Sequence, residues 1–237
     1  MIAQPSVRTK CVVGVLPLFL LTGVLAAAQF AGGTGTADDP YQIATAEQLR
    51  SIGSDPGLLD KQFVLIADID LDPNLPGGKV FDRAVVAPDG DPITDGYQGA
   101  AFSGVFDGND CTISNLRIRG ACYLGLFGQN SGAVRGVGVV NADVAGSGYA
   151  VGALTGWNLG SVTQCHSTGA VAGASLVGGV VGHNDTGRVV LCYSTAAIAA
   201  TGNSVGGLVG NNEGGAVTLS YSAGDVSRDG YVGGLVG

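Results

Sequence analysis

Charged side chains are scarce in this sequence. Lys, Arg, Asp and Glu make up 13% of its 237 residues, against ~25% in an ordinary soluble domain. Only 11 residues are basic, and they form no cluster or stripe along the chain. Proteins that bind nucleic acid neutralise phosphates with clustered Lys and Arg, so this composition argues against nucleic acid as a partner. With two histidines and no H-E-x-x-H motif, the sequence also lacks a zinc-peptidase signature.

Long helices are missing as well. From residue 120 onward no segment carries the 3.6-residue apolar period of a helix, and short β-rich runs alternate with Gly, Asn and Asp turns instead. Glycine has no three-residue period, which excludes collagen. Disorder is excluded because Val, Leu and Ala are abundant and the mean hydropathy is +0.34. The chain is therefore expected to fold into strands and turns.

Glycine is what the sequence has in excess, with 42 residues. Many of them belong to a short motif, the glycine word, that recurs at intervals of 27, 26, 28 and 27 residues. It reads LGLFG at Leu124, VGALTG at Val151, VGGVVG at Val177, and VGGLVG at Val205 and again at Val232. A second word ends at Val134, Val162, Val189 and Val217, and a third begins at Cys165, Cys192 and Ser220. Three words that keep phase over four repeats identify an internal repeat.

A unit of this length built from short strands cannot bury an apolar face alone, but it can when it stacks on copies of itself. We therefore predict an all-β fold, a parallel β-helix (β-solenoid) with coils of about 27 residues and strands ~4.8 Å apart in neighbouring coils. The crossover rule predicts a right-handed coil. Four asparagines follow the glycine words and are expected at left-handed turns: Asn130, Asn158, Asn184 and Asn212.

The N-terminus predicts export. Residues 1–28 read as a signal peptide, in which Arg8 and Lys10 precede an apolar run that ends in Ala26-Ala27-Ala28. The alternative is an uncleaved anchor, but the run is short for a membrane span and no basic stop-transfer segment follows. We expect a secreted or cell-surface protein with no membrane insertion after cleavage. The chain beyond residue 28 then carries nine basic and 19 acidic residues.

Three further regions are expected. Residues 29–44 form a flexible leader, 45–119 an N-terminal cap with the first strands, and 120–237 the repeats. Thr45 and Gln48 predict the start of a short helix, with Leu49 and Ile52 on one side, that covers the end of the stack. Residues 73–101 are a loop rich in Pro, Gly and Asp. The last word opens a coil that the sequence does not complete, which predicts further coils or another domain after Gly237.

The glycine words carry a resemblance. GLFG, VGALTG, VGGVVG and VGGLVG resemble the GLUG-motif repeats of bacterial secreted and cell-surface, adhesin-like proteins; the words at Val151, Val177 and Val205 are each followed by a G-x-V/I-x-x-C/S-Y/H-S stretch. DPYQIATAEQLRSIG, FVLIADIDLD and FSGVFDGNDCTISNLRI resemble the segment that precedes such repeats. The resemblance runs from about Asp38 to Gly237 and departs from the family at Asn109-Asp110-Cys111 and Thr155. It implies a β-helix at the cell surface and no established chemistry.

One candidate metal site was found. Asp68, Asp70 and Asp72 place three carboxylates on one side of an expected strand, and hard cations such as Ca²⁺ prefer oxygen ligands. Pro73 stands where an EF-hand loop requires glycine, and Ile69 and Leu71 suit a packed strand. The main interpretation is therefore structural. No cofactor is expected.

The cysteines and histidines allow more than one interpretation. Cys165 and His166 are adjacent, as in a thiol–imidazole pair, but the repeat places Cys165 and Cys192 in one column, where neighbouring coils lie within disulfide range. Gly202-Asn203-Ser204-Val205-Gly206 matches G-x-S-x-G, yet no helix is expected after it, as a nucleophile elbow requires. A disulfide between Cys165 and Cys192 stays open; a catalytic role for either motif is disfavoured.

A possible binding strip consists of His166, Tyr193 and Tyr221, together with Trp157 and Tyr149. If it faces outward, it offers a surface for glycan or protein. Strict alternation from Val162 favours an inward position, so its face is left open.

Two functions follow. The favoured one is a non-catalytic exported module that acts as a stalk or adhesion scaffold within a larger protein, with a glycan or a surface protein as partner. The alternative is part of a secreted enzyme, either a polysaccharide-cleaving β-helix or the front region of a surface peptidase. A glycosidase needs paired carboxylates, and the acidic residues after residue 120 are few: Asp143, Asp185, Glu213, Asp225 and Asp229.

Overall fold

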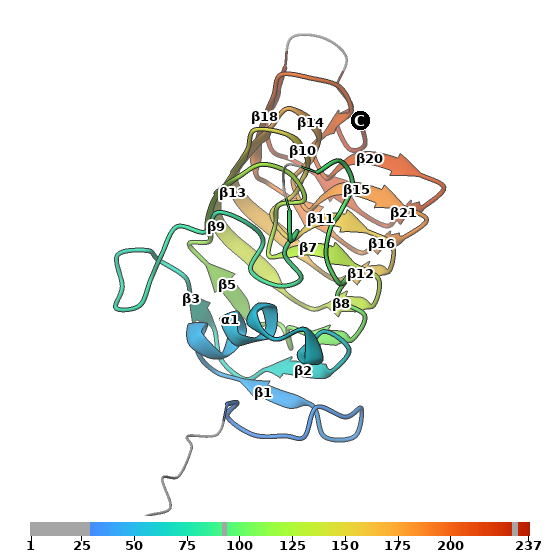
Figure 1. Cartoon of the computed structure of the whole chain (residues 1–237). Coiled ribbons are helices and arrows are strands. Elements are labelled where there is room, and N and C mark those ends of the chain that lie inside the picture. The colour runs from blue at the N-terminus through green and yellow to red at the C-terminus, as the bar shows by residue number, and fades with distance from the viewer. Residues whose placement is uncertain (1–28, 92–93, 229–231) are drawn as a thin grey trace, which may run out of the picture.

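The computed structural model describes residues 29–91, 94–228 and 232–237. The predicted signal peptide, residues 1–28, lies outside the described residues. Strands stack in four sheets that run along one axis, with the N-terminal strands at the bottom and the C-terminal strands at the top (Figure 1). The strands pair in parallel within each sheet.

The first sheet contains one strand from each coil. Its order is β1 (Tyr41–Ile43), β2 (Gln62–Leu65), β4 (Val105–Asp107), β8 (Ala133–Arg135), β12 (Ser161–Thr163), β16 (Arg188–Val190) and β21 (Ala216–Thr218). The second sheet runs β22 (Tyr221–Ser222), β17 (Tyr193–Ser194), β13 (His166–Gly173), β9 (Gly138–Gly146), β5 (Thr112–Ser114) and β3 (Ile69–Asp70), and also includes β6 (Arg117–Gly120), β18 (Ala197–Ala200) and β23 (Val226–Ser227).

The other two sheets carry the glycine words. The third consists of β10 (Tyr149–Val151), β14 (Ser175–Gly178) and β19 (Val205–Gly206). The fourth consists of β20 (Val209–Glu213), β15 (Val181–Asp185), β11 (Thr155–Asn158) and β7 (Phe127–Asn130). The words at Val151, Val177 and Val205 thus each end a strand of the third sheet, turn, and begin a strand of the fourth.

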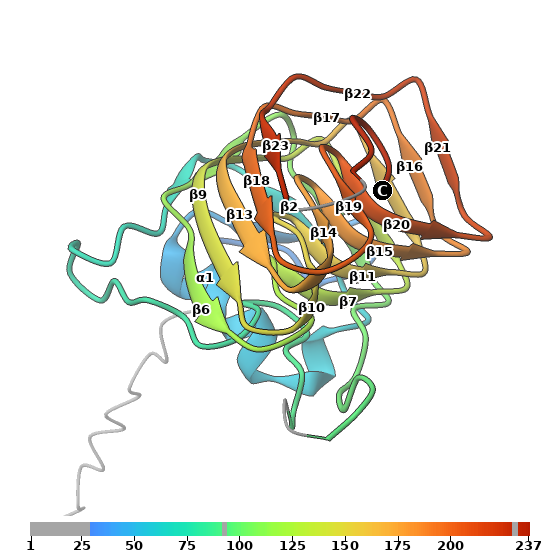
Figure 2. The ribbon, with the colours of Figure 1, turned by 90° about the horizontal axis from the view of Figure 1, so that it is seen from above.

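The predicted register is confirmed. Val151 pairs with Val177, and Val177 with Val205, so equivalent residues of neighbouring coils lie directly over one another. Viewed from the C-terminal end, the chain passes counter-clockwise from β20 to β21, β22 and β23 as it rises toward the viewer (Figure 2), which makes the coil right-handed. Rows of fully buried Val and Leu fill the interior, and one continuous apolar core links all the coils.

The N-terminal helix forms as predicted. In α1 (Ala46–Ser54), the Thr45 hydroxyl accepts a hydrogen bond from the Gln48 N–H (3.2 Å), while the Gln48 side chain accepts one from the Ala44 N–H (2.8 Å). These reciprocal bonds satisfy N–H groups that lack partners within the helix. Leu49 and Ile52 are fully buried. A short 3₁₀ turn, η1 (Pro56–Leu58), follows, and α1 lies at the N-terminal end of the stack (Figure 1).

Two predictions for the N-terminal region need correction. The segment 29–44 is not a flexible leader, because Phe30 is 5% exposed, stacks on Tyr41 at 4.5 Å between ring centroids, and leads into β1. An apolar aromatic ring at the end of the stack is buried against the first coil instead of remaining in solvent. The loop 73–101 also contributes to the stack, since Phe81 and Val86 each form a parallel bridge with the coil above.

The repeated asparagines have a different role from the one predicted. None of the four is among the described residues with positive φ. Their side chains form a hydrogen-bonded ladder inside the stack instead: Asn130 donates to Asn158 (2.8 Å), Asn158 to Asn184 (2.7 Å) and Asn184 to Asn212 (2.5 Å). The first three are fully buried. Buried amides require partners, and stacking at the coil spacing supplies them.

Candidate binding surfaces

The His166 column consists of His166, Tyr193 and Tyr221, which begin β13, β17 and β22 and pair in register. The His166 and Tyr193 rings lie 4.8 Å apart and 3° from parallel, and the two tyrosine rings 5.1 Å apart and 4° from parallel. Tyr221 is 56% exposed, and the other two are half-buried. The column therefore faces solvent and presents ring edges, with their polar atoms, once per coil.

The inward position suggested by strict alternation is wrong. Gln164 lies at the corner between β12 and β13 and has a φ of +54°, and Leu191 and Leu219 repeat this conformation in the next two coils at +56° and +52°. A left-handed residue at the corner turns the chain and shifts the alternation by one residue. Cys165 and Ser167 consequently point inward, 1% and 0% exposed, and His166 between them points outward.

A glycine lies beneath the His166 column. Gly138 pairs with His166, and a Cβ at Gly138 would lie 2.3 Å from the imidazole Cε1. The imidazole therefore rests directly on the backbone of the coil below. Burial lowers the pKa of His166, so the ring is neutral at pH 7 and offers one donor and one acceptor.

Trp157 belongs to a different surface. It lies on β11 in the fourth sheet and pairs with Gln129 and His183, so the proposed strip of Trp157 with His166 does not exist as one surface. The Trp157 column consists of Tyr123, Trp157 and His183, with ring centroids 5.6 and 5.7 Å apart. The first sheet separates the two columns along each coil. Periodicity identified the His166 column, but the Trp157 column appeared only in the structure.

A tyrosine cluster extends the Trp157 column. The Tyr123 and Tyr149 hydroxyls lie 3.0 Å apart, and Tyr149 donates to the Asp95 carboxylate (3.1 Å). Tyr97 packs edge-on against Tyr123 at 5.4 Å and donates to the Ala87 carbonyl (2.7 Å). Burial raises the pKa of both Tyr97 and Tyr123. Sequence reasoning missed Tyr97 and Asp95, because they lie in a loop outside the repeat and no periodic signal places them.

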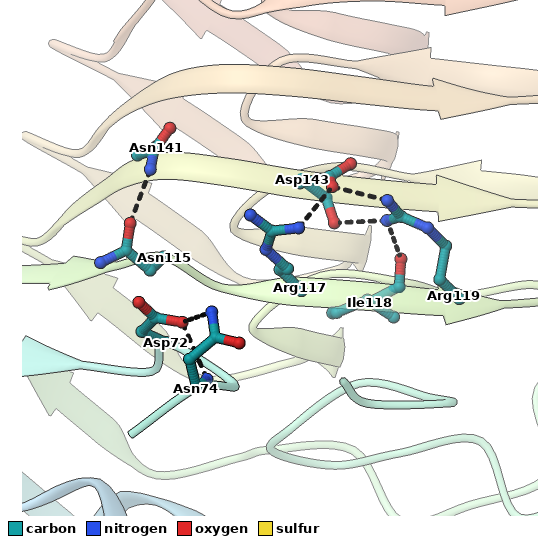
Figure 3. Close-up of polar contacts among 8 residues, drawn as sticks. All are labelled: Asp72, Asn74, Asn115, Arg117, Ile118, Arg119, Asn141 and Asp143. Carbon is teal, nitrogen blue, oxygen red and sulfur yellow. Dashed lines mark hydrogen bonds and ion pairs between the residues drawn. The ribbon is translucent and has the colours of Figure 1, made fainter. Parts of the chain in front are cut away.

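The outer face of the second sheet carries paired polar side chains. Asp143 on β9 accepts from Arg119 on β6 and forms a longer ion pair with Arg117 (3.8 Å), and the Asn141 side chain donates to Asn115 (2.6 Å), as Figure 3 shows. Asp143 is therefore neutralised by arginine. It does not stand beside a second carboxylate, as a glycosidase pair would require.

The predicted calcium ligands do not converge. Asp68 accepts from the Thr112 N–H (2.7 Å), Asp70 from the Asp72 N–H (2.9 Å), and Asp72 from the Asn74 N–H (2.9 Å). Figure 3 shows the contact between Asp72 and Asn74. Within the described residues no group of three His, Cys, Asp or Glu side chains is arranged to hold a metal. The carboxylates stabilise turns and the adjacent strand, in line with the structural interpretation.

The cysteine column is confirmed, but the disulfide is not formed. Cys165 and Cys192 are buried free thiols that face each other across neighbouring coils. Each thiol donates to a backbone carbonyl two residues earlier, Cys165 at 3.2 Å and Cys192 at 3.3 Å. Burial raises the pKa of Cys165, so the thiol is protonated at neutral pH and is a poor nucleophile. A catalytic Cys165–His166 pair is also ruled out geometrically, because the two side chains point to opposite faces.

The G-x-S-x-G match has no elbow geometry. Ser204 has a φ of +58° and leads into the two-residue strand β19, not into a helix. Ala150 and Leu176 take the same left-handed conformation one residue before their own glycine words. The motif is therefore the corner of a coil.

In the described part of the chain no helix has the length and apolarity to cross a membrane.

Comparisons with curated proteins found similarity in sequence to parts of two much longer proteins. No protein-family model matches the chain. The chain is 34% identical over 158 residues to halomucin from Haloquadratum walsbyi, and 36% identical over 140 residues to a "putative Gly-rich membrane protein" from Evansella cellulosilytica. These alignments cover 63% and 56% of this chain but only 2% and 15% of the two relatives. The chain thus corresponds to a small part of each.

A solved structure resembles nearly the whole chain. It is that of a "putative immunoglobulin A1 protease" from Bacteroides ovatus, with a TM-score of 0.64 and 26% identity. The match covers 88% of this chain and 64% of that one. The chain is a parallel β-helix, and this arrangement recurs in a solved protein.

Proposed function

We propose that the chain is a non-catalytic β-helical module of an exported, surface-displayed protein, and that it serves there as a stalk and as a scaffold for adhesion. The observation that carries the proposal is the His166 column, an outward row of polar-edged rings at 4.8 and 5.1 Å intervals. The GLUG-type words, the signal-like N-terminus and the name of the membrane-protein relative support a surface location.

Stacked coils suit both parts of this role. Each coil contacts only its neighbours, so added coils lengthen the module without changing its width. Each added coil also repeats the outward side chains, and repeated weak contacts give strong overall attachment through a high effective concentration. The ring edges of the His166 column offer hydrogen-bonding groups at a spacing comparable to the repeat of an extended polysaccharide. A polymeric glycan is therefore the proposed ligand of this column.

Adhesion is tested with the full chain coupled to beads and presented to immobilised polysaccharides. Replacing Tyr193 and Tyr221 by alanine is expected to weaken binding at least about tenfold, equivalent to ~1.4 kcal/mol. Leu219→Ala is the matched control, since Leu219 is 77% exposed near the same corner and belongs to no ring column. Equal binding by the double variant and the control refutes a role for the column.

The name of the solved neighbour favours one second candidate, in which this module is the front region of a surface peptidase. The non-catalytic proposal predicts that the isolated chain releases no product from immunoglobulin A1 or from pectin-like polysaccharides. Product formation that survives repurification would overturn it and would favour the enzyme.

A further inference from the structure

A pocket of about 330 Å³ lies between α1 and residues 79–88, away from both aromatic columns. Arg50, Lys79 and Arg83 line it together with the apolar side chains of Phe81, Val85 and Pro88. Its volume is at the lower end of the ~300–1,000 Å³ range of small-molecule sites. The pocket can thus hold a ligand of roughly one or two sugar rings.

Positive charge gathers at this pocket in an otherwise acidic chain. Three of the nine basic residues in the described part of the chain line it, and the one carboxylate there, Asp82, lies 3.3 Å from Arg83. No ion pair links Arg50 or Lys79 to a carboxylate of the described residues. The Lys79 ammonium lies over the Phe81 ring at 4.9 Å instead. The pocket therefore carries two positive charges that its own carboxylate does not balance.

The walls of the pocket are held by close packing. A Cβ at Gly53 would lie 1.9 Å from the Val85 carbonyl oxygen, so α1 and the loop are in backbone contact. Both backbone groups of Phe81 form hydrogen bonds with β6: its N–H donates to the Arg117 carbonyl (2.9 Å), and its carbonyl accepts from the Arg119 N–H (2.8 Å). Binding to such a site requires little ordering of the backbone, which favours affinity.

The arrangement fits one class of ligand. A guanidinium fork recognises a carboxylate bidentately, and an ammonium adds a second, less directional charge. The apolar wall suits the C–H face of a sugar ring. We propose that this pocket binds an acidic saccharide, with Arg50 and Lys79 contacting the carboxylate of a uronic acid unit. The inference is independent of the adhesion role proposed for the His166 column.

A purely structural role for the cations is the competing explanation. Gly53 and Ser54 at the C-terminal end of α1 also line the pocket, and cations near a helix C-terminus stabilise the helix dipole. In that case removing a cation lowers stability and leaves ligand binding unchanged. Thermal unfolding is therefore measured beside binding for every variant.

The test uses isothermal titration of the full chain with trigalacturonate and with its uncharged methyl ester. We expect the acid to bind and the ester not to bind. Arg50→Gln and Lys79→Gln should each weaken binding about tenfold or more, since each removes a charge-assisted contact. Arg188→Gln is the matched control, because Arg188 is exposed on β16 and also lacks an ion pair with any described carboxylate. It should change affinity less than about twofold.

The proposal is overturned by no binding of trigalacturonate, by equal binding of acid and ester, by an equal loss in Arg188→Gln, or by lowered stability with unchanged binding in Arg50→Gln and Lys79→Gln. Two competitors test whether the site requires a carboxylate on a sugar or accepts another negatively charged ligand. Displacement of trigalacturonate by equimolar inorganic sulfate or by a hexaglutamate peptide would show a site that recognises charge alone, or an acidic protein, and would equally overturn the saccharide assignment.

Discussion

Replacing Asn158 by alanine removes the centre of the buried asparagine ladder. Asn158 accepts from Asn130 and donates to Asn184 and to the Gly160 carbonyl (3.3 Å). The substitution leaves an Asn130 donor and an Asn184 acceptor without these partners, in a place that water does not reach. Each buried polar group left unpaired costs about 1–3 kcal/mol. The expected loss is therefore about 2–6 kcal/mol, a large part of the ~5–15 kcal/mol that stabilises a typical domain.

Equilibrium urea unfolding, followed by far-ultraviolet circular dichroism, measures this loss. Asn211→Ala is the matched control, because Asn211 lies next to the ladder on β20 but its side chain makes no hydrogen bond with the described residues. The control should change the free energy of unfolding by less than about 1 kcal/mol. If Asn158→Ala is no more destabilising than Asn211→Ala, the ladder is not a source of stability and the reasoning fails.

Three further outcomes are expected. Gly138→Ala should destabilise the fold by about 1–3 kcal/mol through overpacking against His166, whereas Gly234→Ala, whose added Cβ meets nothing within 4 Å, should not; equal effects in urea unfolding contradict this. Because the pKa of His166 is lowered in the fold, the unfolded chain binds more protons, so stability should be complete above pH ~6.5 and fall below it. His166→Asn should flatten that part of the pH profile of stability. An unchanged slope would mean that another titrating group causes the loss of stability. Iodoacetamide at pH 7.5 should label Cys165 and Cys192 only after unfolding in urea, with the label located by peptide mapping because the half-buried Cys111 and Cys122 are also free thiols. Label on Cys165 or Cys192 of the folded chain contradicts their burial, and failure to label these two in the unfolded, unreduced chain reveals a disulfide.

Repetition explains why so much of the fold was predictable. Words that recur every coil place like residues over like, which determines parallel pairing and register once a solenoid is inferred. The N-terminal cap of α1 was equally predictable from the sequence, because Thr45 and Gln48 form hydrogen bonds with backbone groups within one turn. The asparagines were placed correctly in sequence but misinterpreted, because a left-handed turn and a buried amide ladder produce the same periodic signal.

The surfaces were less predictable. Gln164, Leu191 and Leu219 are residues that seldom adopt positive φ, so the corner that reverses the alternation carries no sequence signature. The loop 73–101 does not repeat, and no neighbour coil indicates where its side chains lie. The basic pocket depends on that loop meeting α1, a contact between segments about 30 residues apart.

The sequence by itself determined the period, the parallel stack and the columns of His166 and Cys165, because each of these follows from the spacing of equivalent residues along the chain. The tertiary structure alone decided which columns face solvent, that Trp157 and His166 lie on different sheets, and that Arg50 meets Lys79 at one pocket. These outcomes depend on the direction in which each corner turns the backbone and on contacts between segments that do not repeat, and neither is encoded in periodicity.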